Sequence, residues 1–358
     1  PHLRTDPYDW AIAYREYLTD DARLVLAVLR AAVDDGAVAA ARLPVTGLAD
    51  DRGRVAGVAA RCAETGREVR VRADVVVNAA GPWVEGLARM EEDPPATLLH
   101  LSKGIHVVLD RDRFPVNHLV ICNAEDKRSI FVIPRGDVVY IGTTDTSYHG
   151  SRPLWPEIEA DDVRYLLAPM SRYFDIEPPR PADVIAAWAG VRPLVAQEGK
   201  DPKEMSRKDE ITVGPGGMVS IAGGKLTGFR RMAEDVVGVV AKQLGRSLPD
   251  GPGTDAVPGG GPVPDGTDER LARLYGSETA DVLAFGSDPV VDGGRVRRGE
   301  IDWAIDVEAA TTVEDVIYRR TGAAWFVPRE RDALAPAVAD HMAERLGWDR
   351  GQRDDELA

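Results

Sequence analysis

The sequence predicts a mixed α/β fold, and three observations carry this prediction. Residues 74–83 and 218–227 each show the order strand, glycine-containing turn and helix that is typical of parallel α/β units. Between them, residues 99–142 alternate like antiparallel strands, which indicates a second, inserted sheet. After a stretch rich in Gly and Pro over 249–267, the pattern becomes helical. A chain of 358 residues is then expected to hold two or three domains.

The individual elements follow from apolar periodicity and from turn residues. Helices are expected over 21–34, 83–90, 161–174 and 226–244, and in the tail. Strands are expected over 37–44, 54–62, 68–73, 74–77, 105–109, 119–122, 130–134, 138–142, 211–213 and 218–221, with 182–195 mixing strand and loop. The run over 74–77 is short, apolar and β-branched, so we expect it to be buried on both faces of a sheet.

Composition and charge exclude several classes of protein. With 44 Lys and Arg against 59 Asp and Glu, the formal net charge is -15, which argues against general nucleic-acid binding. No stretch approaches the roughly 18 apolar residues of a membrane-spanning helix, and the first residues lack the apolar core of a signal peptide. Cys62 and Cys122 are far apart, so we expect a reducing, cytoplasmic location and no disulfide. No His or Cys pattern has metal-site spacing, and no metal is expected.

Two glycine-containing turns are the first candidate binding segments. Small residues between a strand and a helix let backbone approach a ligand, and the free N–H groups at a helix start favour negative charge. The turns consist of Asn78, Ala79, Ala80, Gly81, Pro82 and Trp83, and of Gly223, Gly224, Lys225, Leu226 and Thr227. Either could instead be an ordinary strand-to-helix turn. The second is not a nucleotide P-loop, because Leu226 occupies the Ser/Thr position.

Charged and polar residues in apolar surroundings are the second group of candidates. Arg192, flanked by Val, Pro and Leu, and Arg207 are expected to pair with a ligand or with a buried carboxylate. Thr144 and Asp145 lie at a strand end, where they could orient a polyol or form an ordinary turn. His106 lies inside an apolar strand and is either a base or a hydrogen-bonded core residue.

These segments, in this order, resemble the FAD-dependent glycerol-3-phosphate dehydrogenases. The resemblance rests on Asn78–Trp83, Lys103–His106, Gly142–Thr146, Trp188–Leu194, Ser206–Arg207, Gly223–Thr227 and the tail segment Thr312–Thr321. It implies oxidation of sn-glycerol 3-phosphate to dihydroxyacetone phosphate, with hydride passing to flavin N5 and electrons passing on to a quinone. A glycerol-3-phosphate oxidase and an amino-acid or amine oxidase of the same superfamily are the alternatives among enzymes.

The resemblance also assigns roles to the candidate residues. Arg192 and Arg207 would hold the phosphate, with Thr144 and Asp145 near the substrate. His106 would be the base for the C2 hydroxyl, and Lys225 would act beside the flavin. Both glycine-containing turns would line FAD. Peripheral contact with the cytoplasmic membrane and a homodimer are compatible with this assignment.

The expected domains are a partial FAD-binding domain over 1–95, a substrate-binding sheet over 96–185, a return to the FAD-binding domain over 186–248, a linker over 249–267 and a C-terminal helical domain over 268–358. The fold expected from the resemblance is thus an FAD/NAD(P)-binding-like domain, incomplete, with an inserted antiparallel sheet. No Gly-x-Gly-x-x-Gly lies near Pro1, where this family carries its pyrophosphate-binding turn. We therefore expect the chain to be the larger, C-terminal part of such an enzyme, and a fragment without catalytic activity is the alternative.

Overall fold

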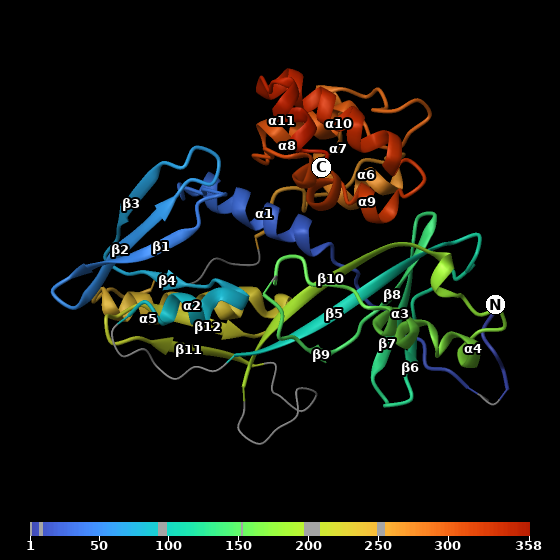
Figure 1. The fold of residues 1–358 in the computed structure, drawn as a ribbon, viewed down its shortest axis with the longest axis horizontal. Coiled ribbons are helices and arrows are strands. Elements are labelled where there is room, and N and C mark those ends of the chain that lie inside the picture. The colour runs from blue at the N-terminus through green and yellow to red at the C-terminus, as the bar shows by residue number, and fades with distance from the viewer. Residues whose placement is uncertain (1, 7–9, 92–98, 152, 197–207, 249–254) are drawn as a thin grey trace.

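A computed structural model describes residues 2–6, 10–91, 99–151, 153–196, 208–248 and 255–358. It contains three sheets and a C-terminal set of helices (Figure 1). The strands are β1 Val45–Asp51, β2 Arg54–Arg61, β3 Glu68–Arg72, β4 Val77–Asn78, β5 Leu99–Asp110, β6 Val120–Asn123, β7 Ser129–Arg135, β8 Val138–Gly142, β9 Thr146–Ser147, β10 Val184–Val195, β11 Asp209–Val213 and β12 Val219–Gly223.

The α-helices form two groups, one before residue 249 and one in the C-terminal part of the chain. Those of the first part are α1 Asp21–Asp34, α2 Val84–Ala88, α3 Ala160–Leu167, α4 Met170–Tyr173 and α5 Phe229–Gln243. Those of the C-terminal helical region, by which we mean residues 268–358, are α6 Glu269–Tyr275, α7 Thr279–Phe285, α8 Arg298–Asp306, α9 Ala323–Phe326, α10 Arg331–Leu346 and α11 Arg350–Asp355.

The largest sheet has the strand order β10-β5-β8-β7-β6, with β9 paired to β5. Its most apolar face packs against α3 and α4, where Ile105, Ile141, Leu166 and Met170 are fully buried. The opposite face carries Tyr140 and Trp188, which pack against Phe326 of the C-terminal helical region. This sheet is therefore covered by helices on both sides, α3 and α4 on one face and the C-terminal helical region on the other.

The two glycine-containing turns lie at the ends of adjacent parallel strands. Val77 and Asn78 of β4 pair with Val219 and Ser220 of β12, and β11 lies on the other side of β12. Because parallel strands end at the same edge of a sheet, the pairing brings both turns to one edge. The Asn78 side chain reinforces the arrangement, since its Nδ2 donates to Ser220 Oγ at 3.2 Å and to the Val84 carbonyl at 2.8 Å.

Several predicted elements differ from the observed ones. The strand predicted over 37–44 is absent, and β1 instead begins at Val45 and continues to a tight turn at Arg52 and Gly53, both with positive φ. Arg42 also has positive φ, which interrupts an extended chain. Of the run over 74–77 only Val77 belongs to a strand, the two-residue β4. Val77 is 42% exposed rather than buried, since β4 has one neighbouring strand among the described residues.

Other differences have equally local causes. The helix predicted over 161–174 is divided into α3 and α4 at Pro169, whose ring cannot continue the hydrogen-bond ladder. The helix predicted over 83–90 is the shorter α2. The segment over 182–195 contains one continuous strand, β10, which tolerates Pro193 because it lies at the sheet edge. The expected domain boundary between residues 185 and 186 falls inside this strand.

Candidate active site

A cavity of about 640 Å³ lies between the largest sheet, the start of α1 and the C-terminal helical region. The sheet contributes strand residues from β5, β7, β8 and β10, and Leu226 contributes from the second glycine-containing turn. The helical region contributes Tyr318, Arg319, Gly322, Trp325 and Phe326. The volume lies within the range of pockets for small molecules.

The floor of the cavity is one face of the β5–β10 pair. In the register of this pair His106 lies opposite Trp188, Gly104 opposite Gly190, and Ser102 opposite Arg192. Residues directly opposite each other in antiparallel strands share a face, so Trp188, Gly190 and Arg192 succeed one another along it. A Cβ built on Gly190 would meet nothing within 4 Å. Gly190 therefore leaves a bare strip of backbone, whereas the space beside Gly104 is occupied by the Arg192 guanidinium. The strip lies between the backbone positions of Arg192 and His106, which are roughly 13 Å apart along the strands.

Arg192 is held at one end of this strip by the strand end that follows β8. Its Nη2 donates to Thr143 Oγ1 at 2.9 Å and its Nη1 to the Thr144 carbonyl at 3.2 Å, while Asp145 Oδ1 lies 3.6 Å from Nη1. Thr144 is buried and its Oγ1 accepts from the Ile105 N–H at 3.0 Å. Thr144 and Asp145 thus position the guanidinium. A Cβ on Gly104 would overlap it, which explains the glycine there.

His106 lies at the other end of the strip in an aromatic environment. Its ring stacks on Trp188 with centroids 4.7 Å apart and an interplanar angle of 14°. Gly142 of β8 lies opposite His106, and a Cβ there would overlap the imidazole. Burial and, secondarily, the charge of Arg192 lower the pKa of His106 to about 4. With this pKa the ring is a neutral imidazole near pH 7, and no hydrogen bond from the described residues occupies its nitrogens.

The second glycine-containing turn meets the cavity through one residue. Leu226 lines the cavity and is 41% exposed, whereas Lys225 and Thr227 beside it are exposed but do not line it. Gly223 and Gly224 have positive φ, and a Cβ on either would overlap Lys208 or Met232, respectively. Trp83 of the first turn is 47% exposed. Arg207, the second predicted phosphate ligand, lies outside the described residues.

Sequence patterns do not identify the aromatic wall of the cavity. Trp188 contacts Trp325 at 5.5 Å and Phe326 at 5.8 Å, and Tyr318 contacts Trp325 at 4.7 Å between ring centroids. Arg135, which the sequence places beside a hairpin turn, lies 3.7 Å over the Phe326 ring and pairs with Asp20 at 2.7 Å. The residues of this wall are far apart in sequence, and their only local signal is the aromatic content of 318–326.

Comparisons with known proteins give the class to which the chain belongs. A family model described as FAD dependent oxidoreductase matches residues 1–229, and one described as the C-terminal domain of alpha-glycerophosphate oxidase matches residues 220–353. The chain belongs to the FAD-dependent oxidoreductase family, as its motifs predict.

Individual relatives are similar to nearly the whole of this chain. The chain is 35% identical over 380 residues to the aerobic glycerol-3-phosphate dehydrogenase of Bacillus subtilis (strain 168), covering 98% of this chain and 68% of that protein. It is 32% identical to the enzyme of that name from Staphylococcus haemolyticus (strain JCSC1435), covering 99% and 69%. An X-ray structure of the glycerol-3-phosphate dehydrogenase from Bacillus halodurans complexed with FAD is 34% identical, with a TM-score of 0.82 over 96% of this chain and 72% of that one.

Two features are absent from the described part of the chain. None of its helices combines the length and the apolar character needed to cross a bilayer. No three His, Cys, Asp or Glu side chains in the described ranges are grouped as a metal site would require.

Proposed function

We propose that this protein oxidises sn-glycerol 3-phosphate to dihydroxyacetone phosphate, with FAD as the hydride acceptor. The observation that carries the proposal is the floor of the cavity, where Arg192 and His106 flank the bare strip at Gly190. A planar guanidinium suits a phosphate dianion, and a neutral imidazole suits the proton of a secondary hydroxyl. The names of the relatives favour the same substrate.

Arg192 binds the phosphate in this proposal, and Arg207 is proposed as a second ligand. Asp145 and Thr143 hold the Arg192 guanidinium so that its fork is oriented before the substrate arrives. The three-carbon chain then lies over Gly190, where no side chain blocks it. This places the C2 hydroxyl toward His106, which takes the proton when the C–H bond at C2 breaks.

Substrate binding also changes the pKa of His106 in this proposal. The positive charge of Arg192 is the second cause, after burial, of the low pKa of His106. A bound phosphate dianion compensates this charge and raises the pKa of the imidazole. The base therefore strengthens when its substrate is in place, and the stacked Trp188 ring keeps its orientation.

The two glycine-containing turns fit the ring portion of FAD. They meet at one sheet edge, their glycines Gly81, Gly223 and Gly224 have positive φ, and Leu226 extends from the second turn into the cavity. Asn78, Ala79, Ala80, Pro82 and Trp83 of the first turn and Lys225 and Thr227 of the second complete the proposed cofactor site. When bound, FAD supplies at N5 the acceptor for the hydride that leaves C2. Lys225 adds positive charge beside the site, which favours an anionic ring.

The test is reduction of the FAD-loaded protein under anaerobic conditions. We expect sn-glycerol 3-phosphate to bleach the flavin bands, and a quinone to reoxidise the flavin faster than oxygen does. Faster reoxidation by oxygen would instead assign an oxidase. Bleaching by glycine or proline, but not by glycerol 3-phosphate, would assign an amine or amino-acid oxidase. A protein that stays colourless after incubation with FAD would overturn the proposal and support a fragment without catalytic activity.

A further inference from the structure

The C-terminal helical region reaches the cavity through an unusual segment. Residues Asp315–Arg320 form a π-helix, η6, and α9 follows directly. π-Helical turns are rare and occur mostly at functional sites, because they widen the helix and redirect side chains. Tyr318 and Arg319 of η6, and Trp325 and Phe326 of α9, line the cavity. The widened helix therefore places side chains in the cavity wall.

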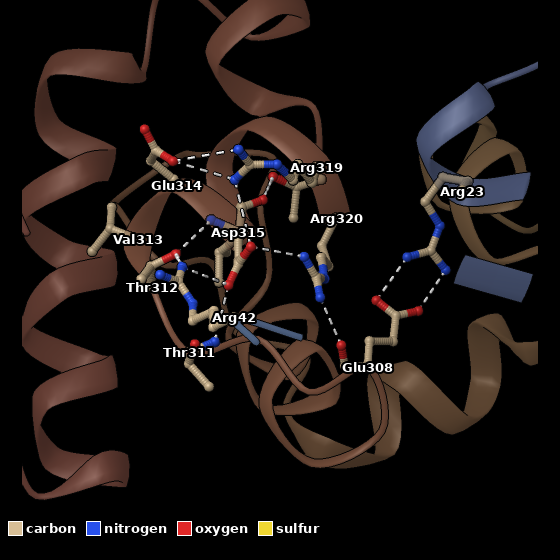
Figure 2. A network of polar contacts seen from close by, with 12 residues as sticks. Arg23, Arg42, Glu308, Thr311, Thr312, Val313, Glu314, Asp315, Arg319 and Arg320 are labelled. Carbon is tan, nitrogen blue, oxygen red and sulfur yellow. Dashed lines mark hydrogen bonds and ion pairs between the residues drawn. The ribbon is translucent and has the colours of Figure 1, made fainter. Parts of the chain in front are cut away.

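A network of ion pairs holds this segment in place (Figure 2). Arg320 donates to Asp315 Oδ1 at 3.0 Å and to the Glu308 carbonyl at 2.7 Å. The Glu308 carboxylate, which is buried, accepts from Arg23 of α1 at 2.7 and 2.8 Å. Arg42 donates to Thr312 Oγ1 at 2.8 Å. The network therefore fixes η6 both within the helical region and against α1, and the aromatic wall has a fixed position.

The wall lies at the His106 end of the floor. Trp325 and Phe326 contact Trp188, which is stacked on His106, and Tyr318 packs on Trp325. A substrate whose phosphate is at Arg192 extends along the strip toward this end. Carbon atoms beyond the reacting hydroxyl must therefore point at the wall.

We infer that Tyr318 and Trp325 are specificity-determining residues that limit the length of the polyol phosphate that the cavity accepts. The inference rests on the proposed function, because the proposed phosphate position sets the direction of the substrate. A hydrophobic wall discriminates against extra carbon atoms by steric exclusion, and removing one aromatic ring opens space for at least one more hydroxymethylene group.

The test compares a three-carbon with a four-carbon substrate, glycerol 3-phosphate with erythritol 4-phosphate. We expect Trp325→Leu and Tyr318→Leu, in the FAD-loaded protein, to raise the ratio of kcat/KM for the four-carbon over the three-carbon ester about tenfold. Phe285→Leu is the matched control, since Phe285 is an exposed aromatic residue of the same helical region away from the cavity, and should leave the ratio unchanged. Thermal unfolding identifies variants that do not fold.

A second readout is independent of turnover. Tryptophan fluorescence gives dissociation constants for the three- and four-carbon keto phosphates, which the oxidised protein cannot oxidise. The same variants should bind the four-carbon ketone about tenfold more tightly relative to the three-carbon one. Equal changes for both lengths, with glycerol 3-phosphate still oxidised, would overturn the inference and leave the proposed function intact. Failure of glycerol 3-phosphate to react with any variant or with the wild type would overturn both.

Discussion

The two sides of the cavity are built in different ways. The sheet side presents Arg192, Gly190 and Trp188 from one strand, so their spacing follows from the two-residue repeat of β10 and from its register with β5. The helical side presents Tyr318 and Trp325 from a π-helix and a short α-helix, which ion pairs hold against α1. The sheet side is thus rigid through backbone pairing, whereas the helical side depends on a few side-chain contacts. Single substitutions should affect the two sides differently.

The largest expected effect is on the helical side. Glu308→Ala leaves Arg23 buried without its carboxylate and removes the acceptor of Trp303 Nε1 at 3.1 Å. Breaking a buried ion pair from one partner costs about 3–5 kcal/mol of unfolding free energy. Urea denaturation of the variant measures this loss. A loss below about 1 kcal/mol would contradict the assigned role of the network.

The next largest effect is on the sheet side of the cavity and depends on pH. The pKa of His106 is about 4 in the folded protein, against 6.5 for an ordinary histidine, so the unfolded chain binds more protons between these limits. The contribution of the neutral His106 to the free energy of unfolding is complete above pH 6.5. It falls by roughly 3 kcal/mol as the pH is lowered toward 4. The difference in unfolding free energy between wild type and His106→Gln should therefore depend on pH over this range. A constant difference would show that His106 is not buried as described.

A smaller effect should come from the bare strip. Gly190→Ala adds a methyl group where nothing lies within 4 Å, so the fold should tolerate it. The methyl group projects into the proposed path of the substrate, and we expect KM for glycerol 3-phosphate to rise about tenfold, corresponding to about 1.4 kcal/mol. Steady-state kinetics and thermal unfolding together check this. An unchanged KM would place the substrate elsewhere in the cavity.

The smallest expected effect is on a partly exposed ion pair, and it serves as the reference for the buried one. Glu278 pairs with Arg30 of α1 at 2.6 Å, but both side chains keep 19% of their surface exposed. Solvent screens such pairs, so Glu278→Ala should cost about 1 kcal/mol or less in unfolding free energy. If it costs as much as Glu308→Ala, burial is not what distinguishes the two contacts between α1 and the helical region.

The two sides of the cavity also differ in how far the sequence predicts them. The predicted strand over 138–142 coincides with β8, and the motif around Arg192 contains Gly190 and Trp188 of the floor, because a strand places neighbours in sequence at fixed positions in space. The partnership of Trp188 with Trp325 depends on how the helical region packs on the sheet, which no local pattern encodes. Likewise, Thr311 and Glu314 have capping-box spacing, but the observed bonds join Thr311 and Thr312 to Asp315, because the chain forms a π-helix there.

The proposed function depends most on recognition of the substrate phosphate by Arg192. The most direct measurement compares the kcat/KM of the FAD-loaded protein for sn-glycerol 3-phosphate with that for glycerol, in wild type and in Arg192→Ala. Loss of a charged hydrogen bond costs about 1.5–3 kcal/mol, so the preference for the phosphate ester should fall by roughly 10- to 150-fold while the reaction with glycerol is little changed. An equal loss with both substrates would contradict the account, because Arg192 would then act on something other than the phosphate.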